Sequence, residues 1–146
     1  MDYTALAAEF MQTMLLLQKS KLQKKLFESL RGEPFILQAL KHHGSAALPG
    51  ELSGTMEISS ARMAVALNSL EDKGLIVREI DKTDRRRILV NLTSKGEETV
   101  IRHQQILLGK TAQALSELGE RDAKEYLRIT KRLAQIMSQQ KEEWAE

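Results

Sequence analysis

The segment from residue 58 to residue 96 constrains the fold more than any other part of the chain. It reads ISSARMAVALNSLEDKGLIVREIDKTDRRRILVNLTSKG. Ser59 can cap a helix that runs to about Lys73 and stops at Gly74, because serine caps helix starts and glycine commonly ends them. One face of this helix is apolar and is predicted to be buried; it contains Met63, Ala66, Leu67 and Leu70.

A β-hairpin is predicted directly after this helix. Residues 75–80 and 87–92 are both rich in isoleucine, leucine and valine, and residues 81–86 join them as a turn. Helical signals resume at Thr93 or Ser94, with acidic residues in the first turn that follows. The segment therefore predicts a helix, a charged hairpin and the start of a further helix.

Long helical patterns flank this segment on both sides. Residues 2–30 carry apolar side chains every three or four positions and are predicted to form one helix. A second helix over residues 33–43 is expected to bury its isoleucine and leucines. The remaining helices are predicted over residues 50–56, from residue 93 or 94 to about 118, and over 120–143. We therefore expect a mainly α protein with a small β-hairpin wing, folded as a single domain over residues 1–146.

Composition excludes several classes of protein. The chain has no cysteine, which rules out disulfides, cysteine–zinc sites and thiol redox switching. Its longest apolar runs are a few residues, so no membrane span is expected, and the acidic Asp2 and Glu9 argue against a signal peptide. We expect a cytoplasmic protein. It is not expected to be an enzyme, because no nucleophile beside a base, phosphate-binding glycine loop or convincing carboxylate pair appears.

The predicted hairpin turn concentrates charge. Residues 81–87 read DKTDRRR, with four basic and two acidic side chains in seven positions. Such a turn can be an exposed loop that stays hydrated. It can also bind DNA, because a helix with a polar first turn followed by a basic hairpin is the arrangement of a winged helix-turn-helix. Arginine suits the second role, since its planar fork stays charged and makes several hydrogen bonds at once.

From about residue 34 to residue 96 the sequence resembles the MarR family of bacterial winged-helix transcription regulators. The matching pieces are ISSARMAVALNSLEDKGLIVR, the triplet Asp84–Arg85–Arg86, and LTSKG over residues 92–96. The resemblance implies a winged helix-turn-helix lobe over residues 34–96. Long helices over residues 1–31 and 97–146 flank it and, in the family, build a dimer.

The resemblance also implies which residues would bind DNA. Arg86 would enter the minor groove, steered by Asp84, while Arg85 and Arg87 would be secondary phosphate contacts, unless Arg87 lies along the strand. Ser59, Ser60 and Arg62 would lie nearest the bases or backbone, at the start of the recognition helix. The chain departs from the family at Ser60, Val65 and Ser69, where a basic residue is common, and at Glu57, where glycine is common.

The function implied is a sequence-specific DNA-binding transcription regulator, a homodimeric repressor whose affinity for DNA responds to a small molecule. Its partners would be double-stranded DNA with a near-palindromic operator, a second copy of the chain, and a small apolar or aromatic ligand. Apolar side chains on several faces of the flanking helices independently favour a dimer; examples are Leu15, Leu16, Ile106, Leu107 and Leu108. Trp144 can close that interface or be a lone exposed aromatic residue.

Other interpretations of the sequence stay open. The missing basic residues favour a rival function, a winged-helix module that pairs with protein and binds DNA weakly or not at all. No metal or other cofactor is expected, because His42, His43 and His103 lack the spacing of a helical metal pair and suit helix ends or the surface. Phe10, Met11, Met14 and Phe35 can line an apolar pocket or belong to a plain core.

Overall fold

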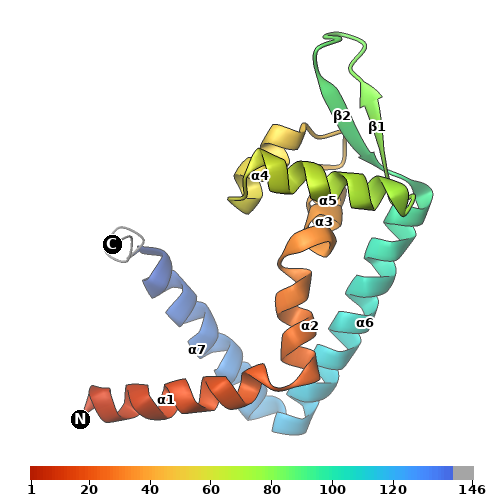
Figure 1. Ribbon diagram of the computed structural model, residues 1–146. Coiled ribbons are helices and arrows are strands. Elements are labelled where there is room, and N and C mark those ends of the chain that lie inside the picture. The colour runs from red at the N-terminus through yellow and green to blue at the C-terminus, as the bar shows by residue number, and fades with distance from the viewer. Residues whose placement is uncertain (140–146) are drawn as a thin grey trace. The chain divides into compact units, whose positions relative to one another are not determined.

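The computed structural model describes residues 1–139, so Trp144 lies outside the described residues. The chain divides into two compact units, Met1–Leu107 and the residues from Leu108 onward. The elements, shown in Figure 1, are α1 (Tyr3–Gln18), α2 (Lys21–Ser29), α3 (Gly32–His43), α4 (Pro49–Met56), α5 (Ser60–Asp72), β1 (Ile76–Ile80), β2 (Ile88–Leu92), α6 (Ser94–Leu118) and α7 (Glu120–Gln139). The prediction of a mainly helical fold with a two-stranded wing is confirmed.

The prediction of one helix over residues 2–30 was wrong, because the chain breaks between α1 and α2. Ser20 adopts an extended conformation (φ −71°, ψ 138°), and its hydroxyl accepts a hydrogen bond of 3.0 Å from the backbone N–H of Gln23. A serine followed three residues later by glutamine is the sequence signature of a helix start. The apolar periodicity continues through the break and concealed it.

The hairpin has the predicted place and an antiparallel register. Ile76 pairs with Leu92 and Ile80 with Ile88, which leaves Arg87 in the turn and outside β2. Ala47 adds a bridge to the outer side of β2, since its N–H donates to the Val90 carbonyl at 3.0 Å and its carbonyl accepts the reverse bond at 2.8 Å. The root of the hairpin is therefore hydrogen-bonded on both sides of β2.

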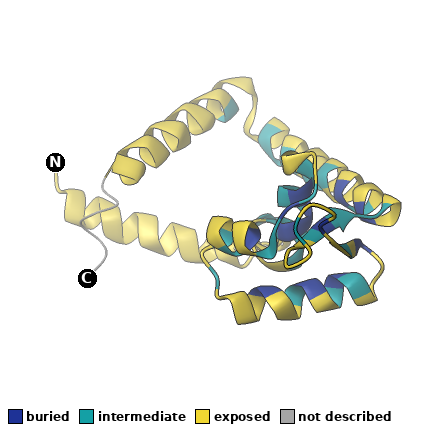
Figure 2. Cartoon of the chain, turned by 90° about the horizontal axis from the view of Figure 1, so that it is seen from above, coloured by how far each residue is buried: buried dark blue, intermediate teal, exposed yellow. Residues whose placement is uncertain are grey.

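The hydrophobic core lies where α3, α4, α5 and the root of the hairpin meet. Its most deeply buried side chains are those of Ile36, Met63, Leu67, Leu70, Ile76 and Val90. By contrast, every residue of α1 is exposed, as Figure 2 shows along the helix at the N-terminus. Phe10, Met11 and Met14 are therefore outside this core. Among the described residues, none of the helices combines the length and apolar composition that crossing a bilayer requires.

The start of α6 is bonded to the end of α5. The hydroxyl of Thr93 donates to the Gly74 carbonyl at 2.6 Å and accepts from the Gly96 N–H at 3.0 Å. The Nζ of Lys95 donates to the Lys73 carbonyl at 2.8 Å. The end of the helix that precedes the hairpin is thus fixed to the long helix that leaves it.

Candidate nucleic-acid interface

The first turn of α5 presents small and basic groups to solvent. Ser59 caps the helix, since its hydroxyl accepts a hydrogen bond of 3.3 Å from the Arg62 N–H. Ser60 and Arg62 are exposed, and this turn carries no acidic residue within the described structure. Met63, one position further, is buried and anchors the helix to the core. The N-terminal end of α5, with its positive partial charge, is therefore open to an anionic partner.

The hairpin turn is built on a nearly buried carboxylate. Asp81 is 9% exposed, and its Oδ1 accepts hydrogen bonds from the Thr83 hydroxyl at 2.7 Å and from the Thr83 N–H at 2.8 Å. These two hydrogen bonds lower the pKa of the Asp81 carboxyl, because they stabilise its charged form. The backbone N–H of Asp81 also donates to the Arg87 carbonyl at 2.9 Å, and this hydrogen bond closes the turn.

Asp84 holds Arg86 in an aimed conformation. Its Oδ1 accepts a hydrogen bond of 3.1 Å from the Arg86 N–H and one of 3.3 Å from the Arg86 Nε. The Arg86 side chain is otherwise free in water, at 92% exposure. Arg85 and Arg87 are exposed on either side of it. The contact expected between Asp84 and Arg86 is present, and the guanidinium is ordered at its base while its tip remains open to a ligand.

An ion pair joins the hairpin to α5. The Nη2 and Nε of Arg78, on β1, donate to Glu71 Oε2 at 2.5 and 3.0 Å, and Nη2 also donates to Asn68 Oδ1 at 2.8 Å. These hydrogen bonds lower the pKa of Glu71 and raise that of Arg78, so both groups are charged at neutral pH. Sequence patterns did not lead us to predict this group. The three-residue spacing of Asn68 and Glu71, which puts them on one helix face, was the available signal.

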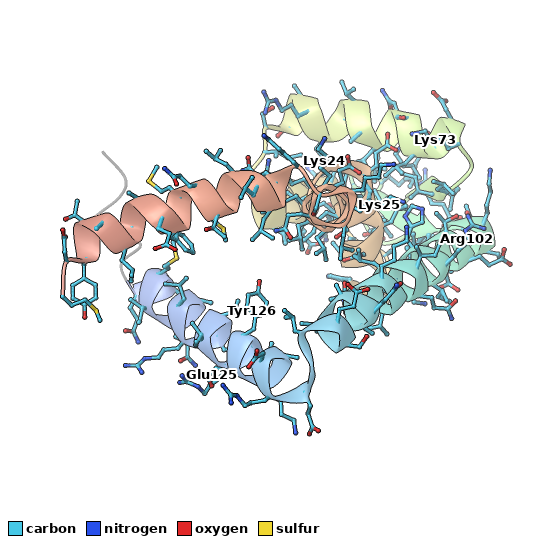
Figure 3. The ribbon with its side chains drawn as sticks, turned by 90° about the horizontal axis from the view of Figure 1, so that it is seen from below. Lys24, Lys25, Lys73, Arg102, Glu125 and Tyr126 are labelled. Atoms are coloured by element: carbon cyan, nitrogen blue, oxygen red, sulfur yellow. The ribbon has the colours of Figure 1, made fainter. Side chains whose placement is uncertain are left out.

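A second ion pair fixes the same end of α5 to α3. Lys73, labelled at the end of α5 in Figure 3, contacts Glu33 with an Nζ to Oε2 distance of 2.5 Å. This ion pair involves no residue of the hairpin. Among the described residues, no three or more histidine, aspartate or glutamate side chains are placed to share a metal ion.

The predicted DNA-binding residues gather on two neighbouring elements. Ser59, Ser60 and Arg62 lie at the start of α5, and residues 84–87 lie at the tip of the hairpin that projects beside it (Figure 1). All of them belong to the unit Met1–Leu107. A helix N-terminus and a basic hairpin tip on one body can enter neighbouring grooves of a duplex.

Comparisons with known proteins give the same family for the chain. The model of the MarR family matches residues 31–87. The HTH-type transcriptional repressor MdtR of Bacillus subtilis is 32% identical over 124 residues, which cover 79% of this chain and 77% of the relative. The uncharacterized HTH-type regulator YwhA of the same organism is 30% identical over 115 residues, covering 76% of this chain and 78% of that protein.

A solved structure agrees with the fold. The crystal structure of YusO from Bacillus subtilis superposes with a TM-score of 0.77 at 27% sequence identity, over 92% of this chain and 99% of that one. The match extends over the flanking helices as well as the segment from α3 to β2. The chain therefore belongs to the MarR family of winged helix-turn-helix transcription regulators, which bind DNA and are not enzymes.

Proposed function

We propose that the protein is a homodimeric repressor that binds a near-palindromic operator through α5 and the hairpin wing. The observation that carries this proposal is Arg86, 92% exposed at the wing tip and held at its base by Asp84. A pre-ordered arginine loses less conformational entropy on binding than a free one. The similarity to MdtR, which is named a transcriptional repressor, supports repression as the outcome.

The residues have distinct roles in this proposal. Arg86 enters the minor groove, while Arg85 and Arg87 contact the flanking phosphates. The first turn of α5 enters the major groove, with Ser59, Ser60 and Arg62 nearest the DNA. Because two serines and one arginine offer few charged contacts, we expect the wing to supply a large share of the electrostatic affinity.

The decisive variant is Arg86→Ala, tested on intergenic DNA from upstream of the protein's own gene. Loss of charge-assisted hydrogen bonds of about 1.5–3 kcal/mol predicts affinity roughly 10- to 100-fold lower. The salt dependence of binding should also fall by about one charge. Fluorescence anisotropy titrations at several salt concentrations measure both quantities.

Arg102→Ala is the matched control. Arg102 is exposed on α6, eight positions after the first residue of that helix, so the variant removes the same charge from an element other than α5 and the hairpin. Its affinity for DNA should stay within about twofold of wild type. Equal affinities for the two variants, or binding that is weak and indifferent to sequence, would refute this function and favour the rival protein-interaction module.

The homodimer is proposed to form through residues 1–31 and 97–146. In the described structure α1 exposes apolar side chains on several sides, among them Phe10 at 52%, Leu15 at 60% and Leu16 at 67%. Tyr126, Ile129, Leu133 and Ile136 on α7 are each about half exposed. Apolar surface of this extent on a soluble protein marks an interaction site. Sedimentation at micromolar concentration should give a dimer, and a monomer would contradict the proposal.

The effector is proposed to be a small aromatic compound. Supporting it is an open hollow of about 440 Å³ lined by Phe27, Glu28, Arg31, Gly32 and Pro34, a volume in the range of small-molecule sites. The Arg31 guanidinium carbon lies 6.0 Å from the centroid of the Phe27 ring, so a cation and an apolar ring adjoin.

The probe for this part of the proposal is 4-hydroxybenzoate, added to the preformed complex with DNA. We expect it to release DNA from wild type and to have no effect on the Phe27→Ala variant. Release from both proteins would place the effector elsewhere, and no release from wild type would remove this class of effector. Neither result would affect the proposal of DNA binding.

A further inference from the structure

We propose that Glu71, Arg78 and Asn68 form a clamp that sets the angle between α5 and the wing, and so positions Arg86 for its contact with DNA. These three side chains are called the clamp. The inference rests on the proposed function and adds residues to it that touch no DNA themselves.

The clamp holds both the side chain and the main chain of β1. One carboxylate oxygen of Glu71 accepts from the Nη2 and Nε of Arg78, at 2.5 and 3.0 Å. The other accepts from the Arg78 backbone N–H at 3.2 Å. Asn68, one helical turn earlier, binds the same guanidinium at 2.8 Å. Such a forked contact restricts rotation of the strand as well as its distance from the helix.

The wing depends on this contact because the last pair of its ladder is only partly covered by the rest of the protein. Ile76 and Val90 are buried at its root, whereas Ile80 and Ile88, the last pair of the ladder, are 66% and 48% exposed. A two-stranded hairpin is only marginally stable by itself. Arg78 pairs with Val90 in the middle of the ladder. It lies on the face of β1 that also carries Ile76 and Ile80, because side chains alternate along a strand.

A small rotation at the root becomes a large displacement at the tip. Residues 79–83 separate Arg78 from Asp84 at the wing tip, so the lever is about 15 Å long at roughly 3.3 Å per residue. A rotation of about 10° would then move the tip by about 2.6 Å, which is enough to break a hydrogen bond. Exposed ion pairs contribute little to stability. The clamp is therefore expected to affect DNA binding more than folding.

A double-mutant cycle between Glu71→Gln and Arg86→Ala tests the proposal, with dissociation constants for the upstream DNA as the readout. In the wild-type background Glu71→Gln should lower affinity about threefold to tenfold, which is part of the loss that Arg86→Ala causes. In the Arg86→Ala background the same substitution should change affinity by less than about twofold. The melting temperature of the Glu71→Gln single variant should stay within about 3 °C of wild type, which is the scale of a 1 kcal/mol change in stability.

Glu33→Gln is the matched control, because it breaks the Lys73–Glu33 ion pair at the same end of α5 without touching the wing. Both substitutions remove one negative charge, so any general electrostatic gain in DNA affinity is common to them. The clamp predicts weaker binding for Glu71→Gln alone. A double variant that exchanges the charges, Glu71→Arg with Arg78→Glu, should bind the upstream DNA more tightly than Glu71→Gln does.

Several results would overturn the clamp. Equal affinities for Glu71→Gln and Glu33→Gln, with a large loss in Arg86→Ala, would refute it while the proposed function stands. A loss of the same size in both backgrounds would show that Glu71 and Arg78 act independently of the wing tip, which also refutes it. If Arg86→Ala itself binds like wild type, both the clamp and the proposed function fail.

Discussion

Replacement of Gly96 by alanine is predicted to destabilise the protein, because the added Cβ would clash with the backbone of Leu75. A Cβ added at Gly96 would lie 2.0 Å from the carbonyl oxygen of Leu75 and 3.1 Å from Cδ2 of Leu92. The first distance is about 1.4 Å shorter than the 3.4 Å at which ordinary contact begins. Because the obstacle is backbone, no side-chain rotation relieves it, and the start of α6 must move away from the end of α5.

The size of the effect follows from two opposing terms. An extra methyl group in a packed site costs about 1–3 kcal/mol, and more where the neighbours cannot yield. Alanine in place of glycine in a helix returns up to about 1 kcal/mol. With a cost at the upper end of the first range, we expect a net loss of about 2 kcal/mol. In a chain of this length that loss lowers the melting temperature by about 4–8 °C.

Thermal unfolding followed by circular dichroism, at fixed protein concentration, measures this loss. Gly54→Ala is the matched control, because Gly54 lies within α4 and a Cβ there meets nothing within 4 Å. The control should melt at or above the wild-type temperature. A Gly96→Ala variant that melts within about 1 °C of wild type, or above it, would refute the packing argument.

Two further predictions concern side-chain hydrogen bonds, one at the start of α6 and one in the hairpin turn. Thr93→Val should cost about 1–3 kcal/mol of unfolding free energy in urea denaturation, because the Gly74 carbonyl and the Gly96 N–H both lose their hydrogen bond to the Thr93 hydroxyl. Thr93→Ser keeps the hydroxyl and should stay close to wild type. Equal losses in the two variants would contradict this prediction. Asp81→Asn should destabilise the protein at pH 7, and the difference from wild type should shrink below about pH 4. The folded pKa of Asp81 is lowered by the Thr83 hydrogen bonds, so its stabilising contribution is present above the unfolded pKa and is lost as the pH falls through the folded one. Denaturation at pH 7 and pH 3 tests this, and a difference that does not vary with pH would count against it.

Local chemistry made the segment from α5 to β2 predictable. Ser59 accepts the capping hydrogen bond expected of it, Gly74 adopts the left-handed conformation (φ 69°) that ends a helix, and the β-forming residues pair across the turn. The contact between Asp84 and Arg86 spans two residues, so it too could be predicted. The DNA contacts assigned to these residues remain predictions.

The ends of helices outside this segment were harder to predict. The apolar stripe of residues 2–30 indicated a continuous helix, yet the Ser20 cap divides it, because a local hydrogen bond can end a helix without interrupting its periodicity. Glu57 adopts a positive φ of 52°, at a position where a left-handed residue joins α4 to the cap of α5. Members of the family often carry glycine at this position, and glycine adopts such a conformation without steric cost.

The order of the elements, the helix ends around α5 and the residues at the wing tip could all be predicted from the amino-acid sequence, because they depend on groups a few positions apart. The close approach of the start of α6 to the residues that follow α5, and the way the wing is held against α5, depend on tertiary packing. The contact that requires glycine at position 96 joins residues 21 positions apart in the chain. The bond from Arg78 to Asn68 likewise depends on how a strand turns back along a helix. Such close approaches are set by the packing of whole elements, and no local pattern encodes them.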